Sequence, residues 1–181
     1  MVGIIIGTLI ALFVLILVVS FNNLAKSRNR VDAAWQQVKA GFDKRRALIS
    51  PILEMLASVS EEDARRFKET FRSRRHGAGD DGITVVQNTE SDLSHEFKNV
   101  LRRMGAYPDI TGNPKFVEYC RKLQDIEEQI ETSRKTYNDN VRTYNSMRTR
   151  FPVGLLSSLF DYTPESYFEV EYATDSRKSK Q

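Results

Sequence analysis

The chain opens on an apolar run, and this run constrains the fold more than any other feature. From Val2 to Phe21 nearly every residue is Ile, Leu, Val or Phe, and no charged side chain precedes Lys26. About twenty helical residues span the roughly 30 Å hydrocarbon layer of a bilayer. Backbone polar groups inside that layer must pair within their own segment. The sequence therefore predicts a transmembrane helix in residues 1–25.

The charges around the run predict its orientation. No basic residue precedes it and no A-x-A-like cleavage site follows it, which favours a retained anchor over a cleaved signal peptide. Lys26, Arg28 and Arg30 come directly after it. Basic juxtamembrane residues stay in the cytoplasm and attract anionic lipid headgroups. We therefore expect the N-terminus outside, the bulk of the chain in the cytoplasm, and lipid contacts at these three side chains.

Small residues form one strip of the predicted span. Gly3, Gly7 and Ala11 are spaced four residues apart, and such a strip lets two membrane helices approach closely. The spacing favours self-association through this strip, and hence a homo-oligomer. The alternative is that glycine is simply frequent in membrane helices.

Residues 26–172 carry the pattern of a helical bundle. Three segments repeat apolar residues in alternating steps of three and four, the period of helices that pack lengthwise. We predict an all-α fold, in which the N-terminal transmembrane helix is followed by an antiparallel bundle of three to four long helices. A disordered polar tail is expected over 173–181. The stripes include Val31, Val38, Phe42 and Leu56, then Leu93, Phe97 and Met104, and then Phe116, Leu123, Ile130, Tyr137, Val141, Tyr144 and Phe151.

Proline, glycine and capping residues predict the helix boundaries. Pro51 cannot donate a backbone hydrogen bond and should bend the first cytoplasmic helix at about 47–50. Gly41, inside the same helix, is expected to weaken it. The other expected boundaries are an N-cap at Ser60, a flexible loop over 76–82, a helix end at Gly105, a turn over 107–112 and an N-cap at Asn113 before Pro114.

No pattern in the sequence is typical of catalysis or metal binding. The glycines of 77–82 match a dinucleotide-binding pattern, but no strand precedes them and two aspartates among them would repel a pyrophosphate. His76 and His95 fall in different segments, and Cys120 is the single cysteine. We expect no catalytic, metal or cofactor site and no small-molecule substrate, although a site assembled only in space leaves no linear trace.

Two basic clusters raise the question of nucleic acid. Residues 44–46 and 74–75 are Lys or Arg, but acidic residues alternate with both clusters and the net charge is only +3. The first cluster also follows the predicted span closely. Attraction to anionic lipid explains these charges more simply, so we expect membrane lipid and no nucleic acid as a partner.

One charge falls on an apolar stripe. Arg45 occupies a stripe position, where a charged group needs a partner. Asn138 and Asn145 lie seven residues apart on the longest helix, beside its stripe. One hypothesis is that this face meets Arg45 and fixes the register of the bundle. The alternative is that the bundle rotates so that Arg45 extends outward to water.

Short motifs are spread from about Arg28 to Glu169. The opening motifs are Arg28-Asn29-Arg30-Val31, Ala34-Trp35 and Lys44-Arg45-Arg46, and the central turn is Tyr107-Pro108-Asp109. The C-terminal signature is Tyr137-Asn138-Asp139, Val141, Tyr144-Asn145, Phe151-Pro152, Leu159-Phe160, Tyr162, Pro164 and Tyr167-Phe168-Glu169. Together these motifs resemble the LemA family.

The resemblance implies a bacterial protein of the cytoplasmic (inner) membrane, or of a membrane derived from it, with one span and a cytosolic helical bundle. The family includes proteins linked to magnetosome formation, and relatives are often encoded beside membrane proteases. Two departures are visible. Residues 49–53 read Ile-Ser-Pro-Ile-Leu where the family usually has Leu-Ile-Pro-Asn-Leu, and the loop at 76–82 interrupts a region that is normally more helical.

These observations predict a membrane-anchored helical interaction or scaffold protein with no catalytic activity of its own. Its expected partners are membrane lipid, a second copy of itself and a membrane protein. Two alternatives are a self-assembling protein that organises or shapes membrane, and an adaptor for a membrane protease.

Overall fold

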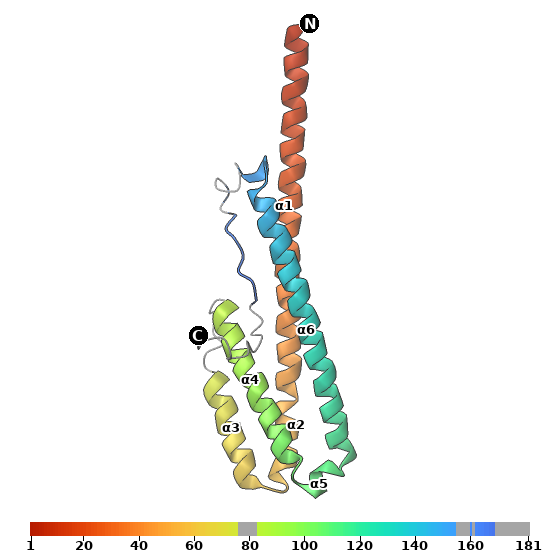
Figure 1. The fold of residues 1–181 in the computed structure, drawn as a ribbon, viewed down its shortest axis with the longest axis vertical. Helices are drawn as coiled ribbons and strands as arrows, with labels where there is room; N and C mark the ends of the chain where they lie inside the picture. The colour runs from red at the N-terminus through yellow and green to blue at the C-terminus, as the bar shows by residue number, and fades with distance from the viewer. Residues whose placement is uncertain (76–82, 155–159, 161, 169–181) are drawn as a thin grey trace, which may run out of the picture. The chain divides into compact units, whose positions relative to one another are not determined.

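The computed structural model describes residues 1–75, 83–154, 160 and 162–168 (Figure 1). The predicted loop at 76–82 and the predicted polar tail at 173–181 lie outside these residues. Within them there is no strand, so the all-α prediction is confirmed. The helices are α1 (Val2–Ala47), α2 (Ile49–Ala57), α3 (Glu61–Arg75), α4 (Ile83–Met104), α5 (Pro108–Thr111) and α6 (Pro114–Thr149).

The chain divides into two compact units. We call residues 1–50 and 118–167 the anchor unit, which holds α1 and most of α6. Residues 51–117, with 168–181, form the short-helix unit around α3 and α4. The predicted boundary between anchor and bundle at residue 25 stays a prediction, because α1 passes through it without a break.

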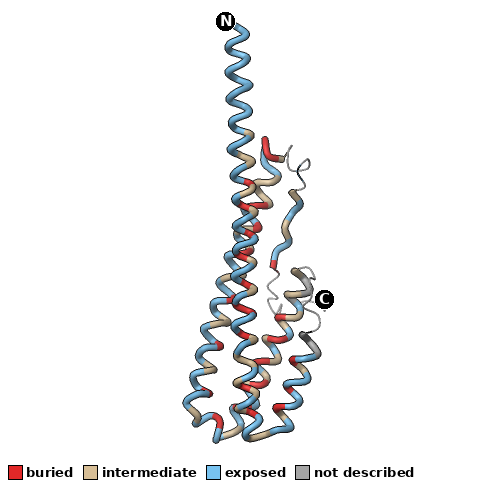
Figure 2. The backbone as a smooth tube through the Cα atoms, turned by 180° about the vertical axis from the view of Figure 1, so that it is seen from behind, coloured by how far each residue is buried: buried red, intermediate tan, exposed pale blue. Residues whose placement is uncertain are grey.

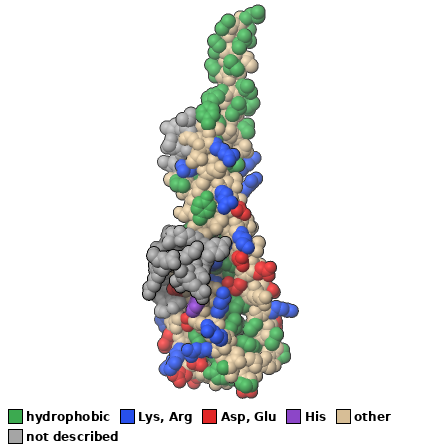
Figure 3. Space-filling model, in the orientation of Figure 1, with side chains coloured by type: hydrophobic (Ala, Val, Ile, Leu, Met, Phe, Trp, Pro, Cys, Tyr) green, Lys and Arg blue, Asp and Glu red, His purple; other side chains and the backbone are tan. Residues whose placement is uncertain are grey.

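α1 changes character along its 46 residues. Its first fifteen positions are all exposed, and Figure 2 shows this part pale along its whole length. Apolar side chains cover the same part of the helix, and Lys and Arg side chains appear beyond it (Figure 3). Among the described residues, one helical stretch, Val2–Ala57, is long and apolar enough to cross a membrane, and the apolar part of it has no buried residue.

The second half of α1 packs against α6 in the anchor unit. The buried residues recur at the predicted spacing on both helices. At Gly41 the two helices approach closely, because a Cβ there would lie 2.7 Å from Cγ1 of Ile130. That Gly41 weakens the helix stays a prediction, and the structure adds a second role, because a side chain at this position would collide with Ile130. The buried stripe residues are Val31, Val38 and Phe42 on α1, and Leu123, Ile130, Tyr137, Val141 and Tyr144 on α6.

The predicted break before Pro51 is confirmed. α1 ends at Ala47 and α2 begins at Ile49. Pro51 has no N–H to donate to the carbonyl of Ala47, four residues earlier, so the helix cannot continue regularly through this point. Leu48 instead donates its N–H to the carbonyl oxygen of Arg45, 3.1 Å away, which tightens the last turn.

The short-helix unit has its own core and caps. Phe71 of α3 contacts Phe97 of α4, with 6.1 Å between ring centroids. Ser60 caps α3 as predicted, accepting the N–H of Asp63 at 3.3 Å. The Asp63 carboxylate in turn accepts the Tyr107 hydroxyl at 2.8 Å. The predicted turn after Gly105 therefore holds one short helix, α5, that is tied back to the start of α3.

Candidate interaction site

The most distinctive polar site lies in the anchor unit, where an extended segment runs along α6. We call residues 162–167 the strap. It carries no regular secondary structure. An irregular segment against helices cannot use their backbone groups, which are already paired within each helix. Its own backbone must therefore find side chains, and α6 supplies them.

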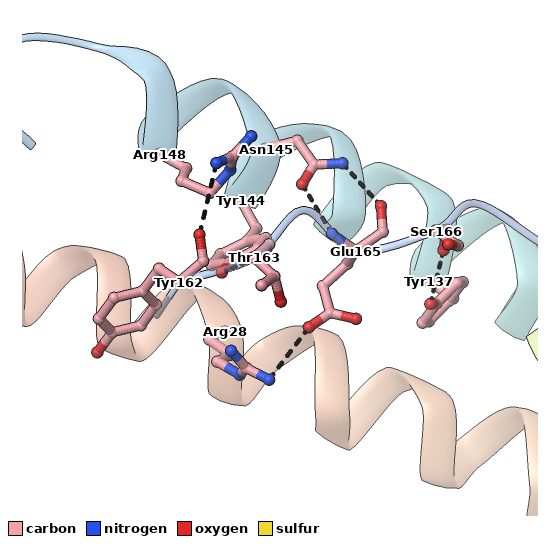
Figure 4. A network of polar contacts seen from close by, with 9 residues as sticks. All are labelled: Arg28, Tyr137, Tyr144, Asn145, Arg148, Tyr162, Thr163, Glu165 and Ser166. Carbon is pink, nitrogen blue, oxygen red and sulfur yellow. Dashed lines mark hydrogen bonds and ion pairs between the residues drawn. The ribbon is translucent and has the colours of Figure 1, made fainter. Parts of the chain in front are cut away.

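Two tyrosines of the α6 stripe hold the strap by its carbonyl oxygens (Figure 4). Tyr144 donates its hydroxyl to the carbonyl of Thr163, and Tyr137 donates to that of Ser166, both at 2.9 Å. Both rings are buried, so each hydroxyl has little access to water. The phenol of a buried tyrosine normally needs such a partner.

Asn145 binds the strap through both atoms of its amide. Its Nδ2 donates to the carbonyl of Glu165 at 2.9 Å, and its Oδ1 accepts the N–H of Glu165 at 3.1 Å. One amide side chain thus satisfies both main-chain groups of one residue, as a neighbouring β-strand would. Figure 4 shows both bonds beside the weaker one, at 3.4 Å, from Arg148 to the carbonyl of Tyr162.

A charge pair joins the strap to α1. The guanidinium of Arg28 lies 3.3 Å from the carboxylate of Glu165 (Figure 4). Arg28 was predicted to contact lipid together with Lys26 and Arg30. The structure places Arg28 partly buried on the strap, while Lys26 and Arg30 are exposed. Lipid contact at the three residues stays a prediction.

Burial, and then nearby charges, raise the pKa of the two tyrosines that hold the strap. The pKa of Tyr137 is raised to about 12, first by burial and then by the carboxylates of Glu165 and Asp32. Burial also raises the pKa of Tyr144, although the nearby Arg28 acts against this. Both phenols therefore stay protonated at neutral pH and remain able to donate to the strap.

A second polar cluster lies further along the same two helices. Arg45 is 2% exposed, and its guanidinium is 3.1 Å from the carboxylate of Glu127 on α6. It also lies over the ring of Phe42, 5.4 Å from the centroid, and Arg134 lies over the same ring at 5.6 Å. Burial and then the charge of Arg45 lower the pKa of Arg134.

The predicted meeting of Arg45 with Asn138 and Asn145 is wrong. Asn145 holds Glu165, whose carboxylate pairs with Arg28. Arg45 lies 17 residues beyond Arg28 on α1, or about 25 Å along the axis. Asn138 is seven residues from Asn145, about 10 Å closer to that level, so neither amide is placed to meet Arg45. The alternative, that Arg45 reaches outward to water, is excluded by its burial.

Other predicted features have the following places. Gly3, Gly7 and Ala11 are all exposed on α1. A Cβ at Gly3 or Gly7 would meet nothing within 4 Å. Self-association through this strip stays a prediction. Cys120 is partly buried, and burial raises its pKa. No group of three or more His, Cys, Asp or Glu able to hold a metal ion occurs among the described residues.

Sequence reasoning missed Glu127 and Glu165, the two carboxylates of these clusters. Glu127 directly follows Ile126 of the α6 stripe, so a search for acidic residues flanking the stripe could have found it. The strap had a signal too, because the Tyr-Asn pairs at 137–138 and 144–145 repeat after seven residues. That repeat places two tyrosines on one face of α6.

A comparison with protein families finds a match over most of the chain. The sequence model of the LemA family matches residues 34–180, which include both polar clusters and the strap apart from Arg28. No curated protein matches the chain.

Proposed function

We propose, from the premise that this chain belongs to the LemA family, that it is a membrane-anchored helical scaffold with no catalytic activity of its own. Its apolar N-terminal helix would hold it in the bacterial cytoplasmic membrane, or in a membrane derived from it, with α6 on the cytoplasmic side. Binding of other molecules would be its activity.

The continuity of α1 carries this proposal. One helix of 46 residues runs from the exposed apolar part into the part packed on α6. Helices bend sharply at proline, at glycine pairs or at bulges, and α1 passes between its two halves without an interruption. α6 is thereby tied to the anchor by a rigid element rather than by a linker, as a scaffold requires.

The use of the polar side chains also supports a scaffold. Tyr137, Tyr144 and Asn145 direct their hydrogen bonds at the chain's own strap. Arg45 and Glu127 face each other across the helix pair. These groups fix one arrangement of α1, α6 and the strap. The exposed face of α6 is then presented at a fixed distance from the membrane.

Cross-linking in cells tests the proposal. A photoactivatable residue at Thr136 or at Arg142, both exposed on α6, should capture a discrete membrane protein in the living cell. The same residue at the buried Val141 is the matched control and should capture nothing. Capture of lipid alone at both exposed positions would contradict a protein-binding role. Capture of a membrane protease would specify the adaptor role that the family resemblance suggests.

A self-assembling, membrane-organising protein is the second candidate. The open space around Gly3 and Gly7 favours it, because another helix could approach the backbone there. Substitution Gly7→Ile should then weaken cross-linking between copies in the membrane, whereas the conservative Leu9→Ile should leave it unchanged. Equal cross-linking in both variants would show that this strip does not form the contact between copies.

A further inference from the structure

Two exposed aromatic rings follow α6. The stripe of α6 predicted a packed Phe151, yet this side chain is 74% exposed because the helix ends at Thr149. Phe160 is 57% exposed. Its ring nevertheless touches α1, with 5.0 Å between its centroid and that of Phe21. The chain beyond α6 therefore returns to the end of the apolar run.

Phe160 and α1 enclose a shallow apolar groove of about 440 Å³. One wall of it belongs to the apolar run, and Val18 on that wall is 60% exposed. Tyr162 extends the aromatic contact, with its ring 5.5 Å from that of Phe21. The groove is lined by Leu17, Val18, Phe21, Asn22, Ala25 and Phe160.

The position of this groove matches the boundary of a bilayer. Phe21 ends the apolar run, and the exposed Lys26 follows it. Aromatic side chains with basic neighbours are typical of the headgroup level, where rings enter the acyl region and cations meet anionic headgroups. Arg150, also exposed, directly precedes Phe151. Burial of one Phe side chain in an apolar medium is worth about 1.5–3 kcal/mol.

We propose that Phe151, Phe160 and the groove form a second membrane contact, occupied by phospholipid acyl chains of the leaflet into which Phe21 faces. The inference rests on the proposed anchoring of α1. Lipid is the occupant that the groove favours, because the Leu17 and Val18 wall continues directly into the exposed span. The contact would hold the end of α6 at the membrane surface.

Fluorescence quenching by brominated phospholipids tests this contact in the full chain. Trp35, the single tryptophan, is first replaced by Phe, which keeps a ring beside Tyr137. Single tryptophans are then introduced as Phe160→Trp and Phe151→Trp, and the protein is reconstituted in phosphatidylcholine–phosphatidylglycerol vesicles. Phe151→Trp disturbs no ring contact with Phe21. Its quenching therefore measures the membrane contact even if Phe160→Trp perturbs the groove.

Two further positions serve as references. Val18→Trp reports the span itself. Val117→Trp is the matched negative control, because Val117 is 59% exposed at the opposite end of α6 from Phe151, about 50 Å along the helix. We expect Phe160→Trp to be quenched at least about half as strongly as Val18→Trp, since interfacial rings lie about 5–10 Å into the boundary. Val117→Trp should not be quenched.

The outcomes separate this inference from the anchoring proposal. Quenching at Val18→Trp with none at Phe160→Trp and Phe151→Trp would overturn the second contact and leave the anchor intact. No quenching at Val18→Trp would overturn both. Quenching at Phe160→Trp that disappears as the protein-to-lipid ratio rises would mean that a second copy fills the groove, and this would also overturn the assignment to lipid.

Discussion

The two polar clusters of the anchor unit hold the same helix pair by different means. At one, a buried charge on α1 meets a carboxylate on α6, side chain to side chain. At the other, side chains of α6 bind the main chain of the strap, and α1 adds a partly exposed ion pair. The first cluster is formed by regular helices alone, whereas the second completes an irregular segment.

This difference follows from where backbone hydrogen bonds go. α1 and α6 satisfy their own main-chain groups, so the Arg45 and Glu127 side chains can pair with each other across the two helices. The strap has no such internal partners. Three side chains of α6 supply these partners, and they bind the main chain of the strap rather than its side chains. They are Tyr137, Tyr144 and Asn145. The two clusters should therefore respond differently to substitution, to pH and to salt.

The largest expected effect is at the buried charge. Substitution Glu127→Gln removes the carboxylate that lies 3.1 Å from the guanidinium of the buried Arg45, near the second positive charge of Arg134. We expect the free energy of unfolding in detergent to fall by about 2–3 kcal/mol, below the range for fully buried pairs because Glu127 is partly exposed. Glu131→Gln, which removes an exposed pair with Lys135, is the control and should cost less than about 0.5 kcal/mol. Equal losses would mean that burial of Arg45 is unimportant.

The next effect is a pH dependence at the strap cluster. A tyrosine in the unfolded chain loses its proton at about pH 10, whereas Tyr137 keeps its proton to about pH 12. Between these values the folded state binds the extra proton, so the free energy of unfolding should fall as pH rises, by a total on the order of 2 kcal/mol. Below pH 10 this contribution is constant.

Tyr137→Phe is the control for that titration, because it removes the ionisable group and keeps the ring. Its free energy of unfolding should fall less steeply than that of the unaltered chain between about pH 10 and 12. Denaturant unfolding at a series of pH values measures both slopes. Identical slopes would show that burial and the neighbouring carboxylates do not raise the pKa of the Tyr137 phenol in the folded chain.

A smaller effect is expected from the amide that binds the strap. Asn145→Ala leaves the N–H and the carbonyl of Glu165 without their partner, at a cost of about 1–2 kcal/mol. Hydrogen exchange at the Glu165 amide should accelerate. Asn140→Ala removes one long bond, 3.5 Å, to the carbonyl of Arg30 and should change neither quantity. An unchanged exchange rate at the Glu165 amide in Asn145→Ala would show that Asn145 does not hold the strap on α6.

The smallest effect concerns the ion pair on α1. Arg28→Gln should cost less than about 1 kcal/mol, because Arg28 is 38% exposed and its pair with Glu165 is screened by solvent. The difference from the unaltered chain should shrink in high salt. Arg30→Gln, two residues on and exposed, should leave the exchange of the strap unchanged. A larger loss of unfolding free energy for Arg30→Gln than for Arg28→Gln would contradict the assignment of Arg28 as the residue of α1 that pairs with the strap.

Local rules predicted the elements of this fold well. Pro51 ends α1 at Ala47, and Asn113 caps α6 by accepting the N–H of Lys115 at 2.9 Å. Such boundaries depend on a few neighbouring residues, which the sequence displays directly. The stripe placed Arg45 on the packing face of α1 but left open whether its side chain is buried or extends to water, and the structure shows it buried.

The partners of those residues could not be predicted in the same way. Glu127 meets Arg45 because of the axial register of two helices, and no local rule fixes that register. The role of Gly41 depends on the same register, because this glycine lets Ile130 of α6 approach α1 closely. The strap was hidden for a further reason. Asn145 and two tyrosines bind its main chain, which is the same for every residue type. The side chains of the strap therefore give little sign in the sequence that this segment packs on α6.

The central claim is that the apolar half of α1 crosses a membrane and that α6 lies on the cytoplasmic side. Thiol labelling of intact cells tests it directly. In a Cys120→Ser background, a cysteine at the exposed Val117 should resist a membrane-impermeant reagent until the cells are permeabilised. A cysteine in place of Val2, at the N-terminal end of the apolar run and on the opposite side of the membrane in this account, should react at once. Rapid labelling of Val117→Cys in intact cells would contradict the account.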